Sequence, residues 1–295
     1  MMEEPEVELV VDAQALIGES PVWSPAEGAL YWADVSGKVL CRTDHATGAT
    51  QRWRVPDDLG GYAILPGGDG AIVALRSGIH RLDLRTNEVA LLVEPPFDPR
   101  THRFNECGID PAGRLWLGEM FDPLPGIDAE PTSGPLHSFT LANGLVTHDV
   151  KARTANGFAW SADGTAFMLA HTNEDVIERI AFDVDAGTLG HRSVFARVDP
   201  QIGQPDGACF DAEGYYWTAL HGGGRLHRYA PDGTLDRVIR LPVDDPTMPT
   251  FGGPALDVLY VTTACHGRAD GDSHAGGLFR LRPGQRGRPT PPFGG

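Results

Sequence analysis

One pattern recurs six times along the 295-residue chain and constrains its fold more than any other feature. Each copy has a tight turn, a strand of apolar and aromatic residues, and a second strand that in the first two copies reads apolar-x-Arg-x-Asp. Equivalent positions of the six copies fall at residues 28, 70, 113, 164, 214 and 257. Intervals of 42 to 51 residues are typical of the four-stranded blades of a β-propeller.

The repeats predict an all-β fold, a six-bladed β-propeller with four-stranded antiparallel blades. No segment between the copies shows a sustained helical period, which argues against alternating strands and helices. We expect residues 1–281 to form this single domain and residues 282–295, which are rich in Pro, Gly and Arg, to form a flexible tail. Two stacked β-sandwiches with similar hairpins are the alternative architecture.

Composition narrows the classes of partner. The chain has 40 Asp and Glu against 24 Lys and Arg, a formal net charge of −16, which argues against nucleic acid or an anionic membrane as a partner. The sequence shows neither a signal peptide nor an apolar stretch long enough to span a bilayer. Four well-separated cysteines without a C-x-x-C pair favour free thiols. We therefore expect a cytoplasmic protein, a monomer or small homo-oligomer, acting on a small molecule.

The strand that precedes each of these positions carries the candidate site. In a propeller the first strand of every blade lines the central channel, so residues in the same phase of each repeat face the same space. Four copies place a carboxylate or a carboxamide at that phase: Glu19, Asn105, Asn156 and Asp206. The second and sixth copies have Gly61 and Pro249 there and are expected to supply no ligand.

Two carboxylates and two carboxamides at one depth, with no cationic side chain in phase, repel one another unless a proton or a metal ion intervenes. A single divalent cation is the simplest solution. Oxygen donors suit Ca²⁺, Mg²⁺ or Mn²⁺ better than a structural zinc, while catalytic Zn²⁺ or iron is also compatible. The alternative is that each polar side chain satisfies backbone groups around a water-filled channel.

Several segments also resemble a known family. They are Ile17-Gly-Glu-Ser-Pro-Val-Trp, Arg103-Phe-Asn-Glu, Asp110-Pro-Ala-Gly-Arg-Leu-Trp-Leu-Gly, Ala155-Asn-Gly-Phe-Ala-Trp-Ser, Gln204-Pro-Asp-Gly-Ala-Cys-Phe-Asp-Ala-Glu-Gly and Leu241-Pro-Val. In this order they resemble the senescence marker protein (regucalcin), gluconolactonase and luciferin-regenerating enzyme family from about Leu16 to Leu281. The resemblance implies a six-bladed propeller in which one divalent cation serves the hydrolysis of sugar-acid lactones.

The resemblance also implies roles for individual residues. It makes Glu19, Asn156 and Asp206 the metal ligands, places Asn105 near the metal and the substrate, and assigns Arg103 to substrate binding. The chain departs from the family at three segments, Asn105-Glu106-Cys107-Gly108 for Asn-Asp-Gly, Gly118-Glu119-Met120 for Gly-Thr-Met, and Ala170-His171-Thr172 for Ala-Asp-Thr. The metal set is therefore complete, whereas the substrate preference is open.

The resulting hypothesis is metal-assisted ester hydrolysis, in which a cation polarises the lactone carbonyl and Asp206 deprotonates the attacking water. His171 and His221 follow hydrophobic strands in corresponding parts of the fourth and fifth copies, so we expect both near the channel mouth as substrate contacts. Two other functions share these residues. One is a phosphotriesterase-like metal hydrolase, and the other is a non-enzymatic propeller that binds calcium or a protein partner.

Overall fold

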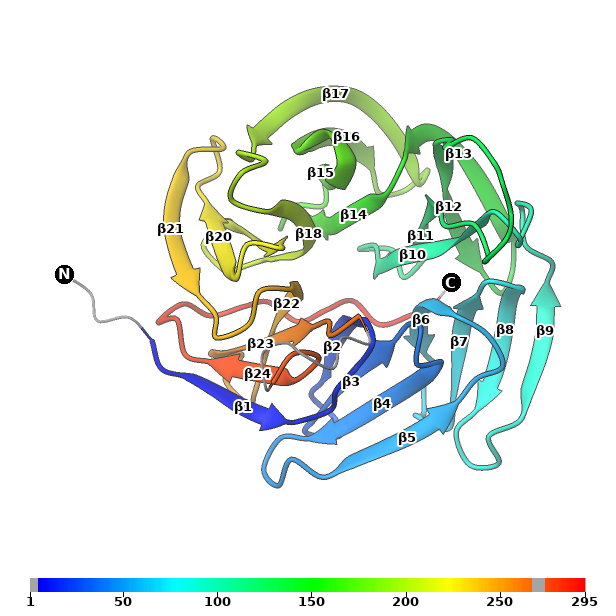
Figure 1. Ribbon diagram of the computed structural model, residues 1–295, viewed down its shortest axis with the longest axis horizontal. Helices are drawn as coiled ribbons and strands as arrows, with labels where there is room; N and C mark the ends of the chain where they lie inside the picture. The colour runs from blue at the N-terminus through cyan, green and yellow to red at the C-terminus, as the bar shows by residue number, and fades with distance from the viewer. Residues whose placement is uncertain (1–4, 267–273, 295) are drawn as a thin grey trace.

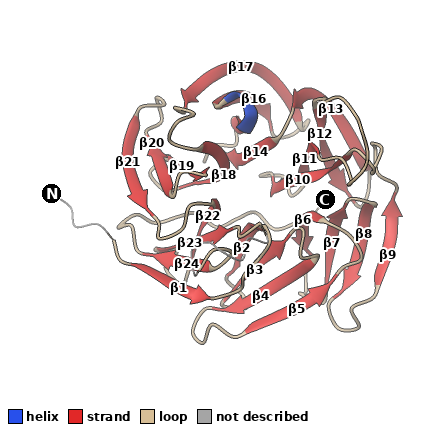
Figure 2. Cartoon of the chain, in the orientation of Figure 1, coloured by secondary structure: helices blue, strands red, loops and turns tan. Residues whose placement is uncertain are grey.

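Six sheets of four strands each surround a central channel in the computed structural model, which describes residues 5–266 and 274–294 (Figure 1). Neighbouring strands within every sheet are antiparallel. The helical structure among the described residues is one 3-10 turn, η1 (Thr172–Glu174) (Figure 2). These observations confirm the predicted all-β six-bladed propeller. No helix in the described ranges is long and apolar enough to cross a membrane.

The strands fall into four groups by their distance from the channel. The inner strands are β2 (Gly18–Ser24), β6 (Leu59–Ile64), β10 (His102–Ile109), β14 (Ala155–Trp160), β18 (Gln204–Phe210) and β22 (Pro246–Gly252). The second strands are β3 (Ala29–Asp34), β7 (Gly70–Leu75), β11 (Leu115–Phe121), β15 (Ala166–His171), β19 (Tyr216–His221) and β23 (Val258–Thr263). The third strands are β4 (Val39–Asp44), β8 (Gly78–Asp83), β12 (Gly134–Thr140), β16 (Val176–Asp183), β20 (Arg225–Tyr229) and β24 (Leu278–Leu281). The outer strands are β5 (Thr50–Arg54), β9 (Val89–Val93), β13 (Gly144–Ala152), β17 (Thr188–Arg197), β21 (Leu235–Arg240) and β1 (Val7–Val11).

The N-terminal strand closes the ring. β1 pairs with β24, with Val7 opposite Leu281, and so becomes the outer strand of the sixth blade. The first and last strands of the chain are thereby joined by backbone hydrogen bonds. This pairing covers the outer edge of β24.

The repeated turn motif has a specific structural basis, clearest in the fifth blade. Asp211 immediately follows the inner strand β18, and its Oδ1 accepts hydrogen bonds from the backbone N–H groups of Glu213 and Tyr215. Its Oδ2 accepts from Trp217 Nε1 at 2.9 Å. Gly214 has a φ of 84°, a left-handed conformation that favours glycine. The Asp-x-x-Gly-x-x-Trp spacing therefore fixes both the hairpin and a buried tryptophan of the second strand.

The hydrophobic core is divided among the gaps between blades. Successive residues of a second strand point to opposite faces, so each such strand contributes to two gaps. In β3, Tyr31 and Ala33 pack towards the second blade, whereas Leu30 and Trp32 pack towards the sixth. This two-sided burial accounts for the continuous apolar runs that recur in the sequence. All four cysteines lie within the described residues as free thiols.

The segment after β24 crosses the propeller. Figure 1 shows it in red, running through the middle of the ring towards β6. Gly287 forms a bridge with Asp211, Arg288 donates to the carbonyl oxygen of Trp160 at 3.0 Å, and Phe293 is 2% exposed against the third blade. A cavity of about 480 Å³ lies between this segment and the ends of the inner strands. This ordered packing differs from the flexible tail expected from composition, because Phe293 supplies an apolar anchor.

Candidate active site

The predicted donor residues lie where the inner strands change register. The pairing of β2 with β3 shifts between Glu19 and Val22, and that of β14 with β15 between Asn156 and Ala159. Matching shifts occur in β10 and β18 at the segments that contain Asn105 and Asp206. A β-bulge redirects side chains and often adjoins a functional site. The four donors therefore share a backbone irregularity as well as a sequence phase.

Three buried carboxylates influence one another at this level of the channel. Glu19 and Asp206 are 6% and 8% exposed, and Glu106 is fully buried. Burial raises the pKa of Glu19 to about 7, although the Ser20 N–H and Arg103 oppose the shift. Burial raises the pKa of Asp206 well above its ordinary value, and the negative charges of Glu19 and Glu106 add to this effect. A bound cation would stabilise the ionised forms, so the electrostatics favour one here.

Hydrogen bonds fix the orientation of both carboxamides. Arg103 Nη1 donates to Asn105 Oδ1 at 3.0 Å, so the Asn105 amide nitrogen is the atom that faces Asn156. That nitrogen donates to Asn156 Oδ1 at 2.7 Å, and Asn156 Nδ2 donates to Thr172 Oγ1 at 2.8 Å. The Thr172 hydroxyl donates in turn to the carbonyl oxygen of Pro205. The chain of bonds links three blades and leaves Asn156 Oδ1 with a second lone pair for a cation.

Arg103 is held from the opposite side by an acidic residue. Its Nε lies 2.8 Å from Asp122 Oδ2, and Arg76 Nη2 lies 2.5 Å from the same oxygen. Burial opposes ionisation of Asp122, yet the Arg103 and Arg76 guanidiniums hold its pKa below the ordinary value. Asp58 also contacts Arg76 at 2.8 Å. Asp122 thus fixes the guanidinium of Arg103, a structural role that was not predicted from the sequence.

The two predicted histidines have different surroundings. His221 Nδ1 lies 3.8 Å from Asp206 Oδ2, which brings His221 next to the predicted base. His171 Nε2 lies 2.9 Å from Glu178 Oε2, and Arg192 contacts the same carboxylate. The structure therefore brings Glu19, Arg103, Asn105, Asn156, Asp206 and His221 together, and it pairs His171 with groups of β16 and β17. Contact of either histidine with substrate stays a prediction.

Glu106 and Glu119, where the chain departs from the family motifs, have structural partners. Those of Glu106 lie in the next blade, and that of Glu119 lies in its own blade. The Glu106 carboxylate accepts hydrogen bonds from Gly157 N and Phe158 N at 2.6 and 2.7 Å, so a side chain of the third blade fixes the bulge of the fourth. Glu119 Oε1 lies 2.6 Å from His137 Nε2 inside the third blade. Neither set of partners could be predicted from sequence, because each partner is distant along the chain.

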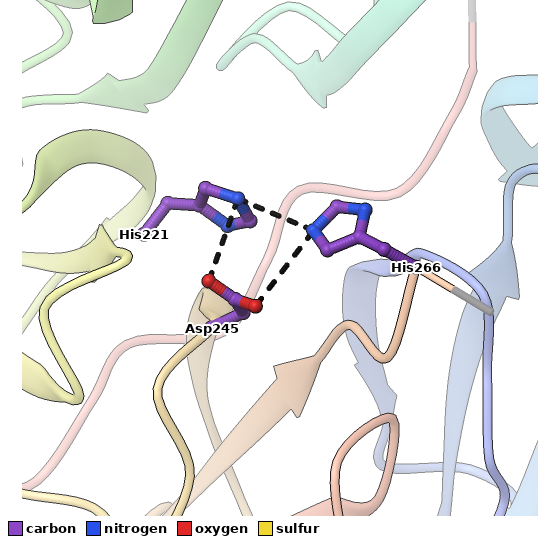
Figure 3. Close-up of side chains that lie close together, drawn as sticks. All are labelled: His221, Asp245 and His266. Atoms are coloured by element: carbon purple, nitrogen blue, oxygen red, sulfur yellow. Dashed lines mark hydrogen bonds and ion pairs between the residues drawn. The ribbon is translucent and has the colours of Figure 1, made fainter. Parts of the chain in front are cut away.

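A second group of metal-ligating side chains adjoins Asp206. His221, Asp245 and His266 point towards one another (Figure 3), and their ligand atoms all lie within 4.8 Å of one another. Asp245 immediately precedes β22, in the copy from which no ligand was expected, and His266 follows β23. Sequence reasoning missed both residues because neither occupies the phase of Glu19 and Asp206.

The donor set of Glu19, Asn156 and Asp206, which we call the oxygen site, fits a hard divalent cation. It offers two carboxylates and one carboxamide oxygen, the donors that Ca²⁺, Mg²⁺ and Mn²⁺ prefer. Both carboxylates are buried, and the positive charge of the Arg103 guanidinium lowers the pKa of Glu19 and of Asp206. Asn105 directs its nitrogen towards Asn156 and its oxygen towards Arg103. It therefore supports the oxygen site without donating an oxygen to it.

The fold and this site define a family of propeller proteins. Residues 17–265 match the SMP-30/Gluconolactonase/LRE-like region, and the chain belongs to that family. Among its relatives, 6-deoxy-6-sulfogluconolactonase of Pseudomonas putida is 37% identical over 270 residues, covering 88% of this chain and 87% of the relative. Regucalcin of Xenopus laevis is 30% identical over 280 residues and covers 93% of both chains. The crystal structure of the calcium-binding protein regucalcin from Agrobacterium tumefaciens superposes with a TM-score of 0.89 at 25% identity, covering 99% of this chain and 97% of that one.

The comparisons confirm the predicted family membership and show that the relatives include a lactonase by name.

Proposed function

We propose that this protein is a divalent-cation-dependent hydrolase that opens a sugar-acid lactone. The observation that carries the proposal is the convergence of Glu19, Asn156 and Asp206 beside the Arg103 fork. The family, and the name of its sulfogluconolactonase member, support the same chemistry. When bound at the oxygen site, the cation supplies Lewis-acid polarisation of the lactone carbonyl.

The side chains of the protein divide the remaining tasks. In this proposal Asp206 takes the proton of the attacking water. The imidazole of His221 lies beside it, with Nδ1 3.8 Å from Asp206 Oδ2. Glu19 and Asn156 hold the cation, and the Thr172 hydroxyl fixes the Asn156 amide. Arg103 presents N–H donors to oxygens of the substrate, and Asp122 holds its guanidinium in place. The water is thereby oriented before reaction, which lowers the entropy cost of the attack.

A direct assay tests this proposal. Metal-free protein is reconstituted with Ca²⁺, Mg²⁺, Mn²⁺, Zn²⁺ or Fe²⁺ in turn and is assayed on a panel of aldonolactones, including a 6-deoxy-6-sulfonated one, and on organophosphate triesters. We expect cation-dependent lactone opening and little triester hydrolysis. Asp206→Asn should lower kcat by about 1,000-fold or more while the protein stays folded. Asp185→Asn, at an exposed hairpin position, is the matched control.

Two outcomes would contradict the proposal. Triester hydrolysis that exceeds lactone opening would favour the phosphotriesterase-like function. Cation binding without turnover of any lactone or ester would favour a calcium-binding propeller, which the regucalcin relatives support by name.

A further inference from the structure

A compact group of nitrogen and oxygen ligands lies beside the oxygen site. His221 is the last residue of β19, Asp245 immediately precedes β22, and His266 follows β23. His221 Nε2 lies 3.3 Å from His266 Nε2 and 3.6 Å from Asp245 Oδ1, and His266 Nε2 lies 3.9 Å from Asp245 Oδ2. Figure 3 shows both imidazoles directed towards the carboxylate. We call these three residues the His-Asp-His cluster.

These distances match the edges of a metal coordination polyhedron. Zinc binds His nitrogen at about 2.0–2.1 Å in tetrahedral geometry, which places neighbouring ligand atoms about 3.4 Å apart. The nitrogen–nitrogen distance of 3.3 Å agrees with this value. The two nitrogen–oxygen distances are longer than hydrogen bonds and need only small side-chain movements to reach it. Two carboxylate oxygens directed at two imidazole nitrogens therefore leave a position for an ion between them.

The backbone around the cluster fixes the ligands. Gly222 N donates to Asp245 Oδ1 at 3.1 Å, which orients the carboxylate. His266 N donates to the carbonyl oxygen of Leu16, and its φ of 49° is left-handed, an uncommon conformation for a residue other than glycine. These contacts hold His266 against the segment that leads to Glu19.

We propose that the His-Asp-His cluster binds a second divalent cation, a transition-metal ion of the zinc class. Two imidazole nitrogens and one carboxylate favour such an ion over Ca²⁺ or Mg²⁺, which prefer oxygen donors. The cluster is distinct from the oxygen site in its residues and in its donor chemistry. Binding of this ion does not depend on lactone hydrolysis.

His221 couples the two sites. Its Nε2 faces the cluster, whereas its Nδ1 faces Asp206 Oδ2 at 3.8 Å. An imidazole that binds a metal through one nitrogen commonly presents its other N–H to a carboxylate. Asp206 is thus a ligand of the oxygen site. It is also the carboxylate that faces the second nitrogen of His221. The two ions are expected to bind as neighbours, linked through the contact between His221 and Asp206.

The experiment uses Co²⁺ as a spectroscopic probe for the zinc class. Full-length protein is stripped of metal, saturated with Ca²⁺ to fill the oxygen site, and titrated with Co²⁺ while visible absorption is recorded; calorimetry with Zn²⁺ gives the stoichiometry. We expect one equivalent of Co²⁺ with the intense absorption of a low-coordinate nitrogen and oxygen site. Asp245→Asn and His266→Ala should each weaken that binding by about 100-fold or more.

Two control variants separate the sites. His191→Ala alters an exposed histidine of β17 and should leave Co²⁺ binding unchanged. Glu19→Gln should weaken Ca²⁺ binding and retain the Co²⁺ absorption. Circular dichroism and melting temperatures establish that each variant is folded. The proposal is overturned if Ca²⁺-saturated protein binds no Co²⁺ or Zn²⁺, or if folded His266→Ala and Asp245→Asn bind them as the unaltered protein does.

Discussion

Gly157 offers a sharp test of how the bulge beside Asn156 is built. Its φ is 69°, and an added Cβ would overlap the Tyr216 hydroxyl and lie 2.7 Å from Ala170 Cβ. The left-handed conformation costs about 1–2 kcal/mol for a residue with a side chain. Displacement of Tyr216 also breaks its 2.8 Å hydrogen bond to the Gly157 carbonyl oxygen, which costs about 1–3 kcal/mol in a buried setting. Gly157→Ala should therefore lower the free energy of unfolding by roughly 2–5 kcal/mol.

Gly144 provides the matched control, because its φ is 68° and an added Cβ would meet no atom within 4 Å. Gly144→Ala should pay only the conformational cost, about 1–2 kcal/mol. Urea unfolding of both variants measures the difference directly. Equal destabilisation by the two substitutions would refute the steric argument. In Gly157→Ala the affinity of the oxygen site for Ca²⁺ should also fall, because Asn156 adjoins the displaced residue.

Three further predictions follow from individual contacts. Burial raises the pKa of Glu19 to about 7, above its ordinary 4.5, so its contribution to the stability of the metal-free protein is fully present below pH 4.5. That contribution, roughly 3 kcal/mol, should be lost as pH rises through 7. Urea unfolding of the unaltered protein and of Glu19→Gln at several pH values should show this loss in the unaltered protein alone. Arg103→Lys keeps the charge but removes the guanidinium that contacts both Asp122 and Asn105, so kcat/KM for the lactone should fall about 100-fold. Arg100→Lys, at an exposed position, is the control and should have no effect. Equal activities of the two variants would exclude Arg103 from substrate positioning. Phe293→Ala should lower the free energy of unfolding by about 3 kcal/mol, because it removes a buried side chain. Leu141→Ala, at a side chain 56% exposed, should change it little. Unchanged stability of Phe293→Ala in urea unfolding would support a flexible tail.

Much of the fold was predictable because it depends on local chemistry. The turn with Asp211, Gly214 and Trp217 needs only residues a few positions apart, so the spacing alone indicated six blades. The phase of Glu19, Asn156 and Asp206 was equally visible, since a β-strand presents its side chains with a fixed period. Phe293 shows the limit of composition, because a Pro- and Gly-rich segment becomes ordered where a single apolar side chain finds a buried gap between blades.

The blade repeat, the phase of the candidate oxygen donors and the family motifs could all be predicted from sequence, because each depends on residues a few positions apart. Contacts between residues that are distant along the chain form only in the folded ring. Glu106 reaches the bulge of the next blade, Asp122 fixes Arg103, and His221 meets Asp245 and His266. These contacts join residues of different strands and blades. The curvature of the closed ring brings these residues within bonding distance, and sequence spacing does not show which residues it brings together.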